Sequence, residues 1–152
     1  MPDDVQLDEA PATLLTAARR VVPTWLRRLA TQAYVRGGGD PAVVAAELDR
    51  TVDAAADAAL QRLAELLATD VDHQRTTPLS VFRDATVPVA DLLRVHDVPP
   101  PAANPASPAT DDYQLQPATW ADIDPTLHEP GLTWGAWKAM TVLARRRDEG
   151  LR

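Results

Sequence analysis

The chain has 152 residues, which is enough for one domain with a single modest core. It has no Cys, which excludes disulfides, a thiolate nucleophile and a Cys-based zinc site. A formal net charge of −7 argues against general binding to nucleic acid, because Lys and Arg must neutralise phosphates there. No apolar run approaches the roughly 20 residues that span a bilayer. The start Met-Pro-Asp-Asp lacks the features of a secretory signal, so we expect a cytoplasmic protein without a membrane span.

The composition favours helices over strands. Ala, Leu and Arg are good helix formers, while β-branched and aromatic residues never gather into alternating runs. We therefore predict an all-α fold, an irregular bundle of about five to seven helices. The bases are almost all Arg and the acids mostly Asp, with Lys138 as the single Lys. This bias and the abundant Ala indicate a GC-rich genome and a bacterial cytoplasm.

Two helices are predicted at the N-terminus. Apolar residues at helical spacing predict one from Ala10 to Val22, and Pro23 should end or kink it. A second helix is expected from about Pro23 to Arg36, where three glycines, residues 37–39, stop it. These glycines follow a helix and lack the Lys-Ser/Thr ending, so they do not indicate a phosphate-binding loop.

The longest helix is expected from the Asp40-Pro41 cap to about Thr69. One of its outer faces carries three acids at intervals of four, Asp49, Asp53 and Asp57. They indicate either a docking face for a basic partner or an ordinary solvated face.

Four arginines lie on the first two helices, Arg19, Arg20, Arg27 and Arg28. We interpret them as solvated side chains or as partners of the acidic face. Contact with phosphate or with an anionic membrane surface is the alternative, and a role in transcription would follow from it.

Two further short helices, interrupted near Pro88, should pack on the long helix. In the following segment, 99–112, five of the fourteen residues are Pro, which predicts an extended linker. The predicted organisation is therefore an N-terminal helical bundle in 1–98, a Pro-rich linker in 99–112 and a C-terminal helical segment in 113–152. We expect the last segment to dock on the bundle, so that the chain forms a single domain overall.

Caps define the start of the C-terminal segment. Thr119 and Asp122 are spaced as a capping box, which should begin a short turn that buries Trp120 and Ile123. The step from Asp124 to Pro125 should cap a second turn.

The last helix is expected to begin at Pro130, with Glu129 held extended before it. One row of the helix holds Leu132, Ala136, Met140 and Leu143, and a second row holds Gly131, Gly135 and Ala139. Small residues four apart let another backbone approach closely. The ring of Trp134 should lie on the stem of Lys138. We predict an interaction surface, in contact either with the rest of the chain or with a partner, formed by Gly131, Trp134, Gly135, Trp137, Lys138 and Ala139.

A polar cluster in the same stretch offers an alternative. It holds four potential ligands within eight residues, Asp122, Asp124, His128 and Glu129. The spacing matches no known zinc motif, so capping explains the acids and we expect neither a metal nor a cofactor. The alternative is a small enzyme or a ligand- or metal-binding domain built on this cluster, but the sequence assigns no catalytic residue.

The second half of the chain resembles a small family of uncharacterised proteins from high-GC Gram-positive bacteria. The resemblance rests on Pro-Ala-Thr-Trp-Ala-Asp from residue 117, Asp-Pro-Thr-Leu-His-Glu-Pro-Gly-Leu from residue 124, the Trp-Gly and Lys-Ala pairs at 134 and 138, and the segment around residue 73. It implies a bacterial cytoplasmic origin; the family has no assigned activity, so the resemblance identifies no catalytic residue. The sequence thus favours a non-enzymatic interaction, adaptor or regulatory protein whose partner is another protein.

Overall fold

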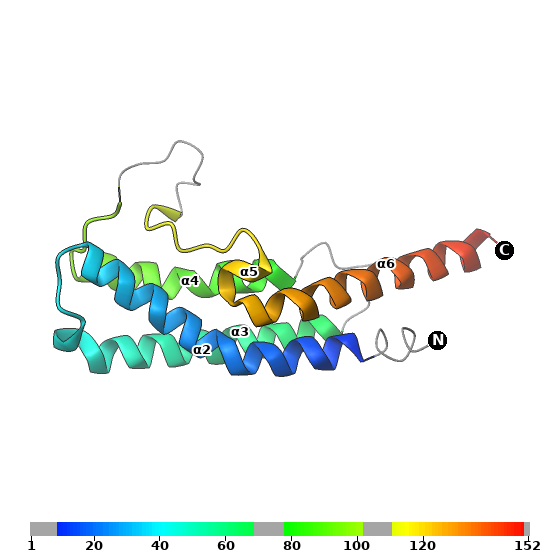
Figure 1. Ribbon diagram of the computed structural model, residues 1–152, viewed down its shortest axis with the longest axis horizontal. Helices are drawn as coiled ribbons and strands as arrows, with labels where there is room; N and C mark the ends of the chain where they lie inside the picture. Colours follow the sequence, from blue (N-terminus) through cyan, green and yellow to red (C-terminus); the bar gives the residue numbers. More distant parts are fainter. Residues whose placement is uncertain (1–8, 69–77, 102–110, 151–152) are drawn as a thin grey trace.

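A computed structural model of the chain describes residues 9–68, 78–101 and 111–150 (Figure 1). Between 141 and 149 it describes the side chains of Leu143 and Arg147 only. Within these ranges the fold contains five α-helices, two short 3-10 helices and no strand. The predicted all-α fold of five to seven helices is confirmed.

The first helix, α2 (Ala10–Arg36), is a single helix with Pro23 inside it. The chain runs through Pro23 as one helix, so the prediction of a separate second helix is wrong. Pro in a helix interior costs about 3 kcal/mol, because it removes one backbone hydrogen bond and crowds the preceding turn. Val22 and Trp25 on either side of Pro23 are both buried, and their burial offsets this local cost.

The second long helix follows a tight glycine turn, as predicted. Gly38 has a φ of 89°, and a Cβ on Gly39 would lie 2.2 Å from the ring of Tyr34. The Asp40 side chain accepts a hydrogen bond from the Ala42 N–H and caps η1 (Pro41–Val44), which leads into α3 (Ala45–Ala68).

One continuous helix, α4 (Pro78–Val95), replaces the two short helices that were expected on either side of Pro88. Pro88 itself is exposed, while the next residue, Val89, is buried. Pro88 leaves the carbonyl of Asp84 without its helical donor, and because Asp84 is exposed, water can satisfy that carbonyl. The predicted division into two helices at Pro88 is therefore wrong, as it is at Pro23.

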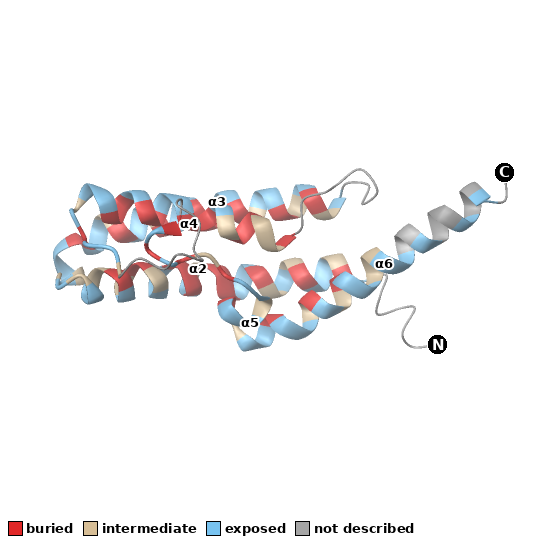
Figure 2. Cartoon of the chain, turned by 90° about the horizontal axis from the view of Figure 1, so that it is seen from above, coloured by how far each residue is buried: buried red, intermediate tan, exposed pale blue. Residues whose placement is uncertain are grey.

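The three long helices α2, α3 and α4 enclose the core, and their buried faces meet in the middle of the bundle (Figure 2). The largest side chains of the core include those of Trp25 and Phe82, whose rings meet edge to face with centroids 6.5 Å apart. Phe82 also meets the ring of Trp120 edge to face, at 5.7 Å. Trp120 thereby connects the C-terminal segment to the core.

The two described ends of the predicted linker are fixed to the bundle, while residues 102–110 lie outside the described residues. Val98 is buried, and its carbonyl accepts a 2.6 Å hydrogen bond from the Tyr113 hydroxyl. The buried carboxylate of Asp111 accepts hydrogen bonds from the backbone N–H groups of Leu115 and Gln116. The C-terminal segment therefore starts from an anchored point.

The chain ends in α5 (Trp120–Ile123), η4 (Pro125–Leu127) and α6 (His128–Gly150). The predicted capping box at Thr119 forms, and Asp124 caps η4. Helix α6 begins at His128 rather than at Pro130, so Glu129 is helical and not extended. Pro130 is tolerated because the first backbone N–H groups of a helix have no helical acceptor.

Helix α6 lies along the N-terminal half of α2 and extends past the ends of the other helices (Figures 1 and 2). In the part of the chain that the structure describes, no helix is long and apolar enough to cross a membrane.

Candidate interaction surface on helix α6

Two arginines of α2 hold the start of the C-terminal segment in place. Arg28 donates a 3.0 Å hydrogen bond to the carbonyl of Ile123, and Arg20 donates one of 3.2 Å to the Thr126 hydroxyl. The side chains of Ile123 and Leu127 are completely buried below these contacts. The hydrogen bonds from the two arginines and the two buried side chains together fix the direction in which α6 leaves η4.

The inner face of α6 is aromatic and packs against the bundle. Trp134 is 5% exposed and stacks on the half-buried Trp137, with ring centroids 4.9 Å apart. Gly131 is buried against Trp120, and a Cβ added to Gly131 would lie 2.5 Å from the Cγ atom of that ring. Because Gly131 has no side chain, the ring of Trp120 can pack against it.

This arrangement divides the predicted interaction surface. The ring of Trp134 is part of the core, so its contact is an internal one. Gly131 faces α5, while Trp137 and Lys138 lie half-buried at the boundary. Only Gly135 and Ala139 are exposed, and a Cβ on Gly135 would meet nothing within 4 Å.

The outer face of α6 is the surface that the prediction missed. Leu132, Met140 and Leu143 are 60%, 52% and 59% exposed, and Ala136 between them is exposed as well. At about 100° per residue these four positions fall within an arc of about 80°, on the side opposite Gly131 and Trp134. We call this set, with the exposed Gly135 and Ala139, the outer face of α6.

No charge interrupts the outer face, although the outer side of a helix on a globular protein is normally polar. Between 132 and 143 the only charged residue is Lys138, which lies toward the bundle. The other long helices carry exposed charges at regular intervals, among them Arg19, Arg20, Arg27, Asp49, Asp53, Asp57, Asp84, Asp91 and Arg94.

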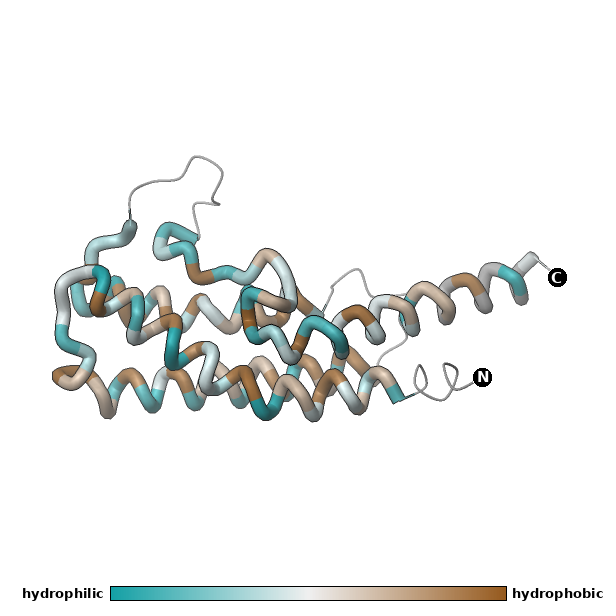
Figure 3. Tube along the Cα trace, viewed as in Figure 1, coloured by the Kyte–Doolittle hydropathy of each residue, from teal (hydrophilic) through white to brown (hydrophobic). Residues whose placement is uncertain are grey.

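The position of α6 in the fold increases the accessibility of this face. Hydrophobic positions recur along the part of α6 that extends past the bundle (Figure 3). Helix α6 thus has apolar residues on two opposite sides, and the bundle covers only one of them. A continuous exposed apolar surface of this kind is typical of sites of protein association.

The predicted polar cluster does not assemble into a site. Asp122 accepts hydrogen bonds from the N–H groups of Ala118 and Thr119, both 2.9 Å, and Asp124 accepts from the Thr126 N–H and hydroxyl. Those two hydrogen bonds from Thr126, with the nearby charges of Arg20 and Arg28, lower the pKa of Asp124 below its usual value of 3.8. Both carboxylates therefore act as caps.

The other two members of the polar cluster, His128 and Glu129, are exposed on the first turn of α6. Among the described residues no group of three or more His, Asp or Glu side chains is arranged to hold a metal ion. The four residues lie close in sequence without forming a common binding centre.

One arginine of α2 pairs with the acidic face of α3, as expected if the arginines are partners of that face. Arg27 forms an ion pair of 3.2 Å with Asp49 and one of 3.8 Å with Asp53. Both partners in the shorter pair are about half exposed, so the pair contributes at most about 1 kcal/mol.

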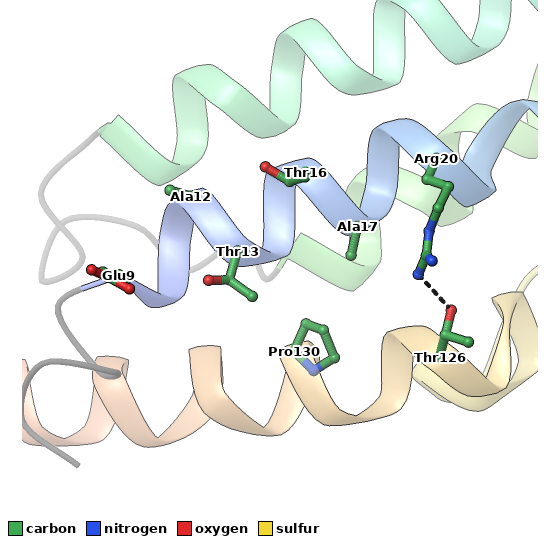
Figure 4. Close-up of a pocket in the computed structure, with 8 residues that line it drawn as sticks. All are labelled: Glu9, Ala12, Thr13, Thr16, Ala17, Arg20, Thr126 and Pro130. Atoms are coloured by element: carbon green, nitrogen blue, oxygen red, sulfur yellow. Dashed lines mark hydrogen bonds between the residues drawn. The ribbon is translucent and has the colours of Figure 1, made fainter. Parts of the chain in front are cut away.

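A groove of about 760 Å³ lies between the start of α2 and the start of α6 (Figure 4). Ala12, Thr13, Thr16 and Ala17 of α2 line it, and Thr13 and Ala17 point toward Pro130 of α6. Its polar groups are those of Glu9, Arg20 and Thr126 and the two other threonines, and the Arg20 guanidinium is already hydrogen-bonded to Thr126. None of the four residues of the predicted polar cluster lines this groove.

Comparisons of the chain with protein-family models, with curated proteins and with solved structures found no match. The resemblance to a family of high-GC Gram-positive bacteria therefore stays a prediction.

Proposed function

We propose that the chain is a non-enzymatic interaction protein that binds another protein through the outer face of α6. The observation that carries the proposal is the uncharged row formed by Leu132, Met140 and Leu143, which remains more than half exposed on a helix already packed on its other side. Leaving three large apolar side chains in water is unfavourable, and a partner would remove that cost. The composition supports placing this interaction in a bacterial cytoplasm.

The absence of Cys from the chain makes a site-specific test straightforward. A benzophenone maleimide attached to Met140→Cys places a photoreactive group on the outer face. The matched control is Val43→Cys, since Val43 is an exposed apolar residue of η1, 79% exposed and distant from α6. Both proteins are irradiated in extract of the cells that produce the chain.

The proposal expects discrete adducts from position 140 that position 43 does not give. The adducts should disappear when Leu132→Asp and Leu143→Asp are added to the Met140→Cys protein, while circular dichroism shows unchanged helix content. Equal adducts from positions 140 and 43, or adducts that survive both Asp substitutions, would show that the outer face binds no protein.

A further inference from the structure

We propose that the protein bound by the outer face of α6 is a second copy of this chain, with the two α6 helices antiparallel. This inference rests on the proposed function and names its partner. It follows from the order of residues along the face and from the positions of two charges beside it.

The outer face is self-complementary when one copy is turned end for end. It has a leucine at each end, Leu132 and Leu143, and the small residues Ala136 and Ala139 in the middle. A two-fold axis midway between residues 137 and 138 places Leu132 of one copy opposite Leu143 of the other. An interface of this kind is isologous, since each contact occurs twice.

The middle of the face suits close packing. Ala136 and Ala139 bring little bulk to the crossing point, and Gly135 at the edge has open space around it. Helix axes can approach to about 8 Å where the facing side chains are small. The same axis places Met140 of one copy beside Ala136 of the other, so a large side chain meets a small one.

The charges beside the face favour the antiparallel arrangement. Glu129 and Arg147 are both exposed, one on the first turn of α6 and the other on its last turn. They are eighteen residues apart, which at about 3.6 residues per turn places them on one line along the helix, just beyond the two ends of the outer face.

In the antiparallel pair Glu129 of each copy lies about one residue from the level of Arg147 of the other. A parallel pair would place both copies of Glu129 at one end and both of Arg147 at the other, with no attraction between them. Association is also sterically accessible, because the end of α6 extends beyond the other helices (Figures 1 and 2).

Disulfide trapping distinguishes the arrangements. Leu132→Cys and Leu143→Cys are made as separate proteins with different tags, mixed and oxidised, with Val43→Cys as the control for random collision. We expect the disulfide between positions 132 and 143, and none between two copies of position 132. In the antiparallel pair the two copies of position 132 lie about 16 Å apart along the axis, at about 1.5 Å per residue, and a disulfide needs Cα atoms within about 7 Å.

Sedimentation measures the association of the unmodified chain. We expect Leu143→Asp to raise the dimer Kd about tenfold or more, because each dimer carries the substitution twice. Val43→Asp, an apolar-to-acid change at a comparably exposed position, should leave the Kd unchanged. Glu129→Arg and Arg147→Glu should each weaken the dimer roughly two- to fivefold and restore it when combined, as for an exposed ion pair.

Each alternative has its own result. Disulfides between identical positions would overturn the antiparallel arrangement. No disulfide above the Val43→Cys control and a monomer at all concentrations would overturn pairing between copies. If photo-adducts from position 140 then contain a different chain, the proposed function stands and only this inference fails; if no adducts form, both fail.

Discussion

The two glycines on neighbouring turns of α6 offer a sharp test of how the helix is fixed. Replacing a helical Gly by Ala raises helix stability by about 1 kcal/mol. Gly135→Ala should show this gain, because its Cβ would enter open space. Gly131→Ala brings the same gain, but its Cβ would lie 2.5 to 2.7 Å from three atoms of the Trp120 ring.

The cost at Gly131 follows from the neighbours of that ring. Trp120 cannot withdraw freely, because its ring also meets Phe82, which is completely buried. Forcing an extra methyl group into a packed site costs about 1 to 3 kcal/mol. Both variants share the helix gain, so Gly131→Ala should be less stable than Gly135→Ala by about 1 to 3 kcal/mol.

Urea unfolding followed by circular dichroism measures this difference. At roughly 2 to 4 °C per kcal/mol for a chain of this size, it also appears as a gap of about 2 to 12 °C in Tm. Adding Trp120→Leu should reduce the cost of Gly131→Ala, as expected for a contact between the two residues. If Gly131→Ala proved as stable as Gly135→Ala, the packing of α5 on α6 described above would be wrong.

Three further predictions concern the polar contacts. Asp111→Ala should lower the free energy of unfolding by about 2 to 3 kcal/mol, since the N–H groups of Leu115 and Gln116 lose a charged acceptor. Chemical denaturation should show a change below about 1 kcal/mol for Asp112→Ala, which loses an exposed ion pair with Arg94. Because the pKa of Asp124 is lowered in the folded protein, its ionised carboxylate stabilises the fold at pH values above the usual pKa of 3.8. This contribution is lost as the pH falls through the lowered pKa. The Tm advantage of the parent over Asp124→Asn should thus be smaller near pH 2 than near pH 6, and an advantage independent of pH would contradict the assignment. Arg27→Ala should cost less than about 1 kcal/mol at low salt and still less at high salt, because its ion pairs are exposed; a larger loss in thermal unfolding would mean that the pairs are stronger than their exposure indicates.

The caps could be predicted from the sequence because each joins residues only a few positions apart. Asp40 bonds to the N–H of Ala42, and Asp124 to that of Thr126. Interactions of this length are determined by the local residues alone, so neither the bundle nor the partner helix needs to be known. The helix starts at η1, α5 and η4 were found in this way.

The two prolines were misinterpreted because their effect depends on distant residues. Pro23 and Pro88 each carry a local cost of about 3 kcal/mol. Trp25, close to Pro23, packs against Phe82 of α4, and Val89 beside Pro88 is fully buried. Burial of one large apolar side chain contributes about 1.5 to 3 kcal/mol, so a few such contacts on each side keep the helix continuous. Comparing the cost of each proline with the gain from burial requires knowledge of the tertiary packing, which the sequence does not show.

The direction of α6 shows where sequence patterns stop being informative. Periodicity predicted a leucine row and a small-residue row on this helix, but neither pattern indicates which side the bundle will cover. The choice is made by contacts across the chain: Arg28 holds the Ile123 carbonyl, and Trp120 fills the space beside Gly131. With the helix start fixed in this way, Trp134 turns inward, where its ring buries more area than a leucine can. The leucine row must then face away from the bundle, so the uncharged outer face is a consequence of the burial of Trp134.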